Sequence, residues 1–224
     1  MNQYQAPLAR ALSVYAPMVR AYNSIDDPDS AQEVLDIATG MIAPPIDQFL
    51  AFNEADILIK RGDLEGAEAA VQRGETIIDQ FKLEDARYLV FMLEGFLNRR
   101  KGDFESSSEA FQSALDQINR SVLGGSDLYQ ELPALQAELA ESRILSGHLD
   151  AAEKALEEGF RLDPNEPLLW LTKARFQLAS GLPQLAQASV NYALAIWNDA
   201  DPEYEDVISA RALQREISLS LPTG

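Results

Sequence analysis

Apolar residues at helical spacing flank four glycines in the chain: Gly62, Gly102, Gly147 and Gly181. On each side of a glycine, apolar positions recur every three or four residues, which is typical of an amphipathic helix. Glycine adopts positive φ at little steric cost, so it can end one helix and start a tight turn into the next. The pattern therefore predicts four helix–turn–helix units.

Four positions around each glycine keep the same character, and we call them the repeat columns. Small residues lie seven positions before and five positions after the glycine: Ala55, Gly95, Ala140 and Ala174, then Ala67, Ser107, Ala152 and Ala186. A larger apolar residue lies nine positions after it and a small one twelve after: Val71, Phe111, Leu156 and Val190, then Gly74, Ala114, Gly159 and Ala193. Small side chains let two antiparallel helices approach closely, and the last two columns share one face of the second helix. Each unit therefore has a face that a neighbour must cover.

The repeat columns resemble those of the tetratricopeptide repeat, a 34-residue helix pair. The best copies are "LLWLTKARFQLASGLPQLAQASVNYALAIW", with Trp170 at the aromatic position, and "LAESRILSGHLDAAEKALEEGFRLDPN", with Pro164 as the terminal proline. Gln136 replaces the expected aromatic residue, and Ser107 replaces alanine in the second copy. The resemblance covers about residues 48 to 200. It implies an all-α, right-handed α-solenoid of helix–turn–helix repeats.

We expect the repeat region to span residues 46–200, with repeats at about 48–81, 88–121, 133–166 and 167–200. Gly102 and Gly147 are 45 residues apart, which leaves an insertion at about "SVLGGSDLYQE". That segment is predicted to form a longer loop or an extra turn. The spacing of 40 between Gly62 and Gly102 is consistent with longer helices around "DQFKLEDAR".

Residues 1–45 are predicted to form an N-terminal helical extension. One helix is expected around Leu8 to Tyr22, and a capping box of Ser30 with Glu33 is expected to open a second helix that Pro44-Pro45 ends. Three residues of the second helix match repeat positions: Ala31, Leu35 and Ala38. The extension is therefore interpreted as a degenerate first repeat.

Residues 201–224 are predicted to form a capping helix and a tail. Four apolar residues share one stripe there: Val207, Ala210, Leu213 and Ile217. An amphipathic helix of this kind would cover the exposed end of a solenoid, which needs a cap to stay soluble.

Charge narrows the range of partners. The chain has 18 basic and 36 acidic side chains and a net charge of −18. This charge disfavours binding to nucleic acid and polybasic docking to membranes. No run approaches the ~18 uninterrupted apolar residues of a membrane span, so no direct membrane insertion is expected. The N-terminus lacks the features of a signal peptide, so we expect a cytoplasmic protein, or a periplasmic one if it is a fragment of a larger exported bacterial protein.

Few residues suggest chemistry. The chain has no cysteine, and its one histidine, His148, lies at a turn position without a nucleophile nearby in sequence. Glu138 and Glu141, with Asp56, could suggest a metal or acid–base site, but solvated carboxylates on a repeat surface are the favoured interpretation. Arg99-Arg100-Lys101 is interpreted as pairing with the dipole of a helix C-terminus. We expect no catalytic residue, cofactor or metal, and no enzymatic activity.

The family resemblance implies a concave groove lined by the first helix of each pair. The predicted groove residues are Phe49, Phe52, Asp56, Leu89, Met92, Phe96, Arg99, Glu141, Leu168, Leu171 and Arg175. One subclass of the family binds chaperone C-termini through lysine, asparagine and arginine. The matching positions here hold Phe52, Asp56, Leu93, Ala134 and Glu138, so that clamp is absent. A competing interpretation is that the N-terminal helix already fills the groove.

The sequence thus predicts a protein–protein interaction module, an adaptor or scaffold that binds a partner peptide or helix with apolar anchors. One alternative is a regulatory, peptide-sensing domain of a larger protein, and a second is a helical enzyme. Homodimerisation is a further possibility.

Overall fold

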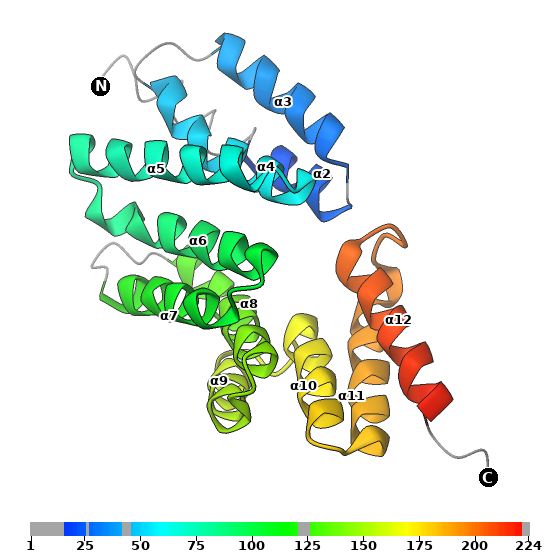
Figure 1. Cartoon of the computed structure of the whole chain (residues 1–224). Helices are drawn as coiled ribbons and strands as arrows, with labels where there is room; N and C mark the ends of the chain where they lie inside the picture. Colours follow the sequence, from blue (N-terminus) through cyan, green and yellow to red (C-terminus); the bar gives the residue numbers. More distant parts are fainter. Residues whose placement is uncertain (1–15, 26, 42–45, 121–125, 221–224) are drawn as a thin grey trace. The chain divides into compact units, whose positions relative to one another are not determined.

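The computed structural model describes residues 16–25, 27–41, 46–120 and 126–220 (Figure 1). These residues form α-helices and short 3-10 helices and no strand, which confirms the all-α prediction. The chain divides into two compact units, Met1–Gly102 and Asp103–Gly224.

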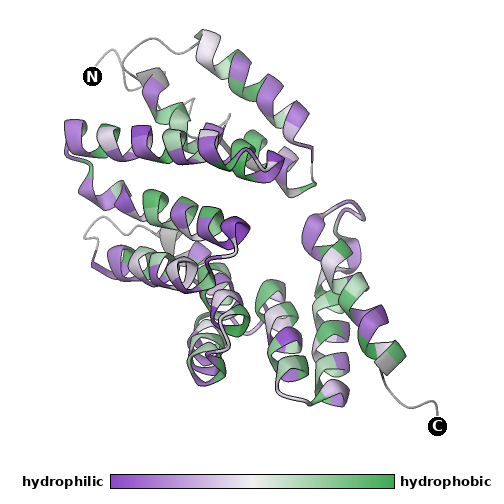
Figure 2. Cartoon of the chain, in the orientation of Figure 1, coloured by the Kyte–Doolittle hydropathy of each residue, from purple (hydrophilic) through white to green (hydrophobic). Residues whose placement is uncertain are grey.

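Unit 1 consists of α2 (Ala16–Ser24), α3 (Pro28–Met41), η2 (Ile46–Leu50), α4 (Ala51–Arg61), α5 (Leu64–Phe81), η3 (Glu84–Ala86) and α6 (Arg87–Lys101). Unit 2 consists of α7 (Phe104–Arg120), α8 (Ser126–Leu145), α9 (Leu149–Leu162), α10 (Pro167–Ala179), α11 (Pro183–Ile196), η4 (Trp197–Asp199) and α12 (Glu205–Ser220). Within each unit consecutive helices pack against each other, among them α4 with α5, α8 with α9 and α10 with α11. Figure 2 shows that hydrophobic and hydrophilic residues alternate along these helices, as amphipathic packing requires.

The four glycines of the pattern make the turns that the sequence predicts. Gly62, Gly102, Gly147 and Gly181 have φ values of 76°, 79°, 82° and 74°. Each glycine N–H donates to a carbonyl three residues earlier, for example from Gly181 to Leu178 at 3.0 Å. A side chain at these backbone angles would be strained, so glycine ends the first helix of each pair.

The repeat columns are buried throughout, as the close approach of helices requires. Gly74 shows the reason for a small residue most clearly, because a Cβ there would lie 2.6 Å from the ring of Phe52. Ser107, which departs from the expected alanine, has its buried hydroxyl 2.9 Å from that of Ser142. This hydrogen bond offsets the cost of burying a polar group between α7 and α8.

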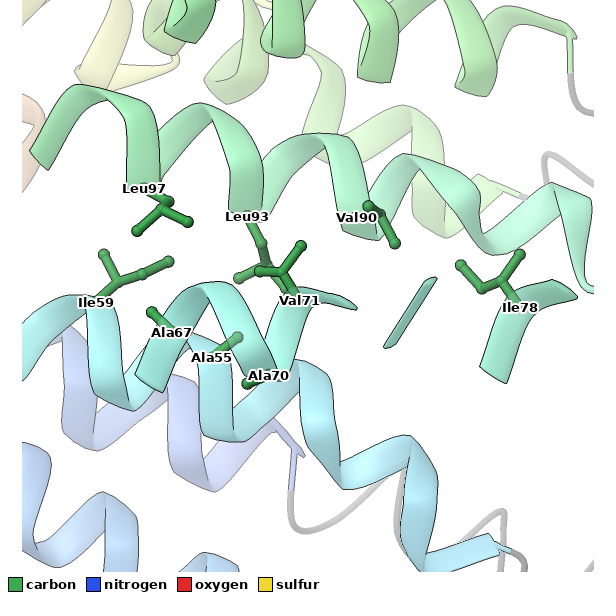
Figure 3. Packing of buried hydrophobic residues seen from close by; sticks show 9 residues of the cluster. All are labelled: Ala55, Ile59, Ala67, Ala70, Val71, Ile78, Val90, Leu93 and Leu97. Atoms are coloured by element: carbon green, nitrogen blue, oxygen red, sulfur yellow. The ribbon is translucent and has the colours of Figure 1, made fainter. Parts of the chain in front are cut away.

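Apolar side chains from three helices form the core of unit 1 (Figure 3). Ile59 of α4 and Val71 of α5 face Val90, Leu93 and Leu97 of α6. The second helix of one pair is thus covered by the first helix of the next, which is how a stack of repeats builds a continuous core.

The start of α3 differs from the prediction. Asp27, and not Ser30, caps this helix, since its carboxylate accepts a hydrogen bond from the Ser30 N–H at 3.0 Å. The helix begins at Pro28, whose fixed φ suits the first helical position. The capping-box assignment of Ser30 with Glu33 is therefore wrong. Residues 1–15 and Pro44-Pro45 lie outside the described residues, so their part of the prediction is not tested.

Two predicted irregularities appear as longer helices. The segment "SVLGGSDLYQE" contributes its residues from Ser126 onward to α8, which gives the extra turn, while residues 121–125 lie outside the described part. The longer helix expected around "DQFKLEDAR" is α5, which has 18 residues and ends at Lys82 in a left-handed conformation.

Helix α12 packs against the last helix pair, at the place where a cap is predicted. Ala210, Leu213 and Ile217 join one buried cluster with Val190 and Ala193 of α11. The apolar face of α11 that another repeat would cover is covered by α12 instead. No helix within the described residues is long and apolar enough to cross a membrane.

Replacing Ala174 with leucine is expected to destabilise the protein by about 1–3 kcal/mol, because Ala174 is fully buried between α10 and α11 and the added atoms overpack the contact. Ala179→Leu, at an exposed position on the same helix, is the matched control. Urea unfolding of the two variants measures the difference. Equal stability of both would contradict the packing described for this column.

Candidate functional site

The predicted groove residues lie on first helices or directly beside them, in both units. Unit 1 contributes Phe49 from η2, Phe52 and Asp56 from α4, and Leu89, Met92, Phe96 and Arg99 from α6. Unit 2 contributes Glu141 from α8 and Leu168, Leu171 and Arg175 from α10.

The two aromatic residues Phe49 of η2 and Phe52 of α4 are engaged in packing within unit 1. The rings of Phe49 and Phe81 are 5.6 Å apart between centroids. Phe52 lies against Gly74 of α5, where the missing side chain leaves room for its ring. Both rings therefore serve first to hold α4 against α5.

Asp56 accepts a hydrogen bond from α2, a helix of the N-terminal extension. Asn23 of α2 donates a hydrogen bond from Nδ2 to the Asp56 carboxylate at 2.8 Å. A second link joins the same region, since Arg61 pairs with Asp29 at 2.7 Å. The described part of the N-terminal extension thus packs along α4 and satisfies a residue that the sequence assigned to the groove.

Helix α6 presents a row of half-buried side chains: Leu89, Met92, Phe96 and Arg99. They recur at i, i+3 and i+4 spacing, so they share one face of the helix. The Arg99 guanidinium carbon lies 5.9 Å from the centre of the Phe96 ring, a cation–π distance. The basic triplet that Arg99 begins occupies the last turn of α6, as predicted, and its Lys101 also pairs with Glu68 at 2.8 Å.

Unit 2 carries a polar row across the first helices α8 and α10 and the C-terminal helix α12. Glu141 of α8 pairs through Oε1 with Nη1 of Arg175 on α10 at 3.1 Å. Arg175 Nη2 donates in turn to the Ser209 hydroxyl of α12 at 2.6 Å. The three residues are separated by 34 positions each, which is the repeat length. Ser209 was not identified from the sequence, although this spacing could have found it.

One end of this row is incompletely paired. The Oε2 atom of Glu141 is buried and has no hydrogen-bond partner among the described residues. A buried carboxylate oxygen without a donor costs free energy. The ion pair of the same carboxylate with Arg175 offsets part of this cost.

Acidic groups from the same three helices gather near the row. Burial raises the pKa of the Tyr204 hydroxyl, and the neighbouring charges of Asp206, Glu166 and Glu138 raise it further. Burial also raises the pKa of Glu166. Glu138 is one helical turn before Glu141 on α8, and Asp206 is one turn before Ser209 on α12. Within the described residues, no group of three or more such side chains could hold a metal ion.

The two leucines assigned to the groove have different environments. Leu171 is fully buried in the core of unit 2, so it stabilises the helix pair and presents no surface to a partner. Leu168 is only partly buried and packs on the edge of the same cluster. We define the first-helix surface of unit 2 as Glu141, Leu168, Arg175 and Ser209.

His148 is a turn residue, as its position after Gly147 indicates. It precedes α9, and its Nδ1 lies 3.2 Å from the Ser146 hydroxyl and 3.3 Å from a carboxylate oxygen of Glu105. The ring is exposed. The Ser146 hydroxyl beside it also donates to the Arg143 carbonyl at 3.2 Å, so the prediction that no nucleophile lies near His148 in sequence is wrong.

Comparison with known proteins supports the repeat interpretation. Residues 133–176 match the family model "Tetratricopeptide repeat". A chain from the crystal structure of the APC/C hetero-tetramer Cut9-Hcn1 superposes with a TM-score of 0.66 at 18% identity, over 91% of this chain and 35% of the other. This chain therefore spans about a third of the length of that protein. No curated protein matches it significantly.

A second solved structure, the TPR2AB-domain:pHSP90-complex of yeast Sti1, is 12% identical and covers 91% of this chain and 97% of the other, with a TM-score of 0.38. The resemblance to the tetratricopeptide repeat family is thus confirmed, in sequence over residues 133–176 and in fold by the superposition on the Cut9-Hcn1 structure.

Proposed function

We propose that this chain is an adaptor or scaffold that binds a segment of a partner protein on the first-helix surface of unit 2. Tetratricopeptide repeat proteins are protein-interaction modules, and their scaffolds are typically non-catalytic. The solved chain of similar fold belongs to a hetero-tetramer, which supports a protein partner for this chain as well.

The observation that carries the proposal is the row Glu141, Arg175 and Ser209. It places a charged pair and a hydroxyl on three adjacent helices, with both arginine contacts already fixed. Preorganised polar groups lose little freedom on binding, so more of the contact energy appears as affinity.

The surroundings of the row indicate the kind of segment. Glu138, Glu166 and Asp206 make this region acidic, in a chain of net charge −18. A segment with a basic side chain or a free backbone N–H fits this charge better than an acidic one. Leu168 offers a partly exposed apolar contact beside the row, so we also expect an apolar anchor in the segment.

The row on α6 is a second proposed contact surface, in unit 1. Leu89, Met92 and Phe96 provide apolar area, and Arg99 provides a charge at its end. Aromatic residues, methionine and arginine are the types enriched at interfaces. Phe96→Ala is therefore expected to weaken binding by about 1–3 kcal/mol without unfolding the helices.

Arg175→Glu is expected to change the set of proteins that the chain captures from a lysate of its source organism, because it places two carboxylates together and breaks both arginine contacts. Arg175→Gln is the milder variant, and circular dichroism shows that each remains folded. Lys154→Glu, at an exposed position on α9, makes the same change of charge elsewhere. If all baits retain the same proteins in the same amounts, the first-helix surface of unit 2 is not the binding site.

A further inference from the structure

A pocket of about 410 Å³ lies on another side of unit 2, between the end of α11, η4 and α12. Leu194, Trp197 and Val207 supply its apolar part. Arg211 and Arg215 line it from α12 and are one helical turn apart, so their guanidinium groups lie on the same face of the helix.

The charges of Arg211 and Arg215 are not neutralised by a carboxylate of the described residues, in contrast to those of several other arginines. Arg61, Arg73 and Arg87 each form an ion pair at 2.8 Å or less. Neither Arg211 nor Arg215 has a carboxylate at ion-pair distance in the described ranges, and Arg215 uses only Nε, on the Arg211 carbonyl at 3.2 Å. Two adjacent guanidinium groups without counter-charge, in a chain with twice as many acidic as basic side chains, make a local site for an anion.

An exposed apolar row runs along α11 beside this pocket. Leu185, Tyr192 and Ile196 are 53%, 45% and 37% exposed, and Ala188 and Ala195 between them are also exposed. Helix α11 contains no charged residue. Depletion of charge together with aromatic and aliphatic side chains is typical of the centre of a protein interface.

The apolar row and the pocket are neighbours, because α12 packs along one edge of α11. Gln214, which lines the pocket, donates to Asn191 at 2.7 Å, and Ser218 donates to Gln187 at 3.0 Å. Asn191 is followed directly by Tyr192 of the exposed row. The pocket therefore lies at the C-terminal end of α11 on the side that meets α12, and the exposed row occupies another face of the same helix.

We propose that this surface of α11 and α12 binds an amphipathic segment of a partner protein, whose apolar side chains cover the α11 row and whose aspartate or glutamate reaches Arg211 and Arg215. The carboxylate matches the unpaired guanidinium groups in charge and in planar geometry. A second copy of this chain is disfavoured as the occupant, since two chains of net charge −18 repel each other. The surface shares no residue with the first-helix surface of unit 2.

Panning a phage-displayed library of random peptides on the full chain tests this proposal. The enriched peptides are expected to have apolar residues at helical spacing with an aspartate or glutamate near one end. In fluorescence polarisation, the double variant Arg211→Glu with Arg215→Glu is expected to weaken binding of such a peptide about tenfold or more. Arg211→Gln with Arg215→Gln should weaken binding of the peptide less than the two glutamates do. Tyr192→Asp should weaken binding of the peptide even when both arginines are intact.

Arg100→Glu with Lys154→Glu is the control, because it makes the same change of charge at two exposed positions elsewhere. This control should leave the affinity unchanged, which separates the two arginines from a general effect of added negative charge. The proposal is overturned if no peptide is enriched, if enriched peptides lack acidic residues, or if the double arginine variants bind them normally. It is also overturned if light scattering shows a homodimer that Tyr192→Asp dissociates.

Discussion

A chain truncated before Tyr204 is expected to aggregate or to associate with itself, because it loses the helix that covers α11. Helix α12 buries Val207, Leu213 and Ile217 almost completely, and it shields Val190 of α11. Burial of each of the three side chains stabilises the folded chain by about 1.5–3 kcal/mol. The free energy of unfolding of a whole domain is only about 5–15 kcal/mol. Light scattering of the truncated and full-length chains measures the effect.

A matched pair of point variants separates the cap from a general effect of shortening the chain. Ile217→Asp places a charge at a fully buried position, whereas Ile208→Asp places it at a position that is 50% exposed on the same helix. Only Ile217→Asp should cause the aggregation or self-association that is expected of the truncated chain. A truncated chain that stays monomeric and as stable as the intact one would show that α12 is not a cap.

Trp170→Ala is expected to cost about 3 kcal/mol of stability, at the lower end of the range for an aromatic residue because Trp170 is only partly buried. Its ring centroid is 4.9 Å from that of Phe160 and 4.4 Å from that of Tyr192, so it joins α9, α10 and α11. Its indole N–H also donates to the Pro164 carbonyl at 2.8 Å.

Urea unfolding measures this change. Leu185→Ala is the control, since Leu185 is a large apolar residue that is 53% exposed on α11, and a surface change of this kind costs less than about 0.5 kcal/mol. Similar losses in the two variants would mean that the Trp170 contacts do not stabilise the repeat.

The repeat columns could be predicted from the sequence because local requirements set them. A turn with φ near 75° needs glycine, and helices in close contact need small side chains, so the same residue types recur in each copy. The start of α3 could not be predicted as surely, because Asp27 and Ser30 are both good caps and the prediction chose the wrong one.

The candidate site was predictable in position and not in detail. The repeat alignment places Leu171 and Arg175 on the same helix, but only packing shows that Leu171 is buried while Arg175 reaches Glu141 and Ser209. Side-chain depth and pairing depend on the neighbouring helices, which sequence spacing does not describe. The contact between Asn23 and Asp56 was missed for the same reason.

The most direct test of the proposed function is titration calorimetry with a partner segment recovered by pull-down, on the wild type, Arg175→Glu and Lys154→Glu. We predict that Arg175→Glu weakens binding about tenfold or more, equivalent to about 1.4 kcal/mol, while Lys154→Glu binds as the wild type does. Unchanged affinity in Arg175→Glu would contradict binding on the first-helix surface of unit 2.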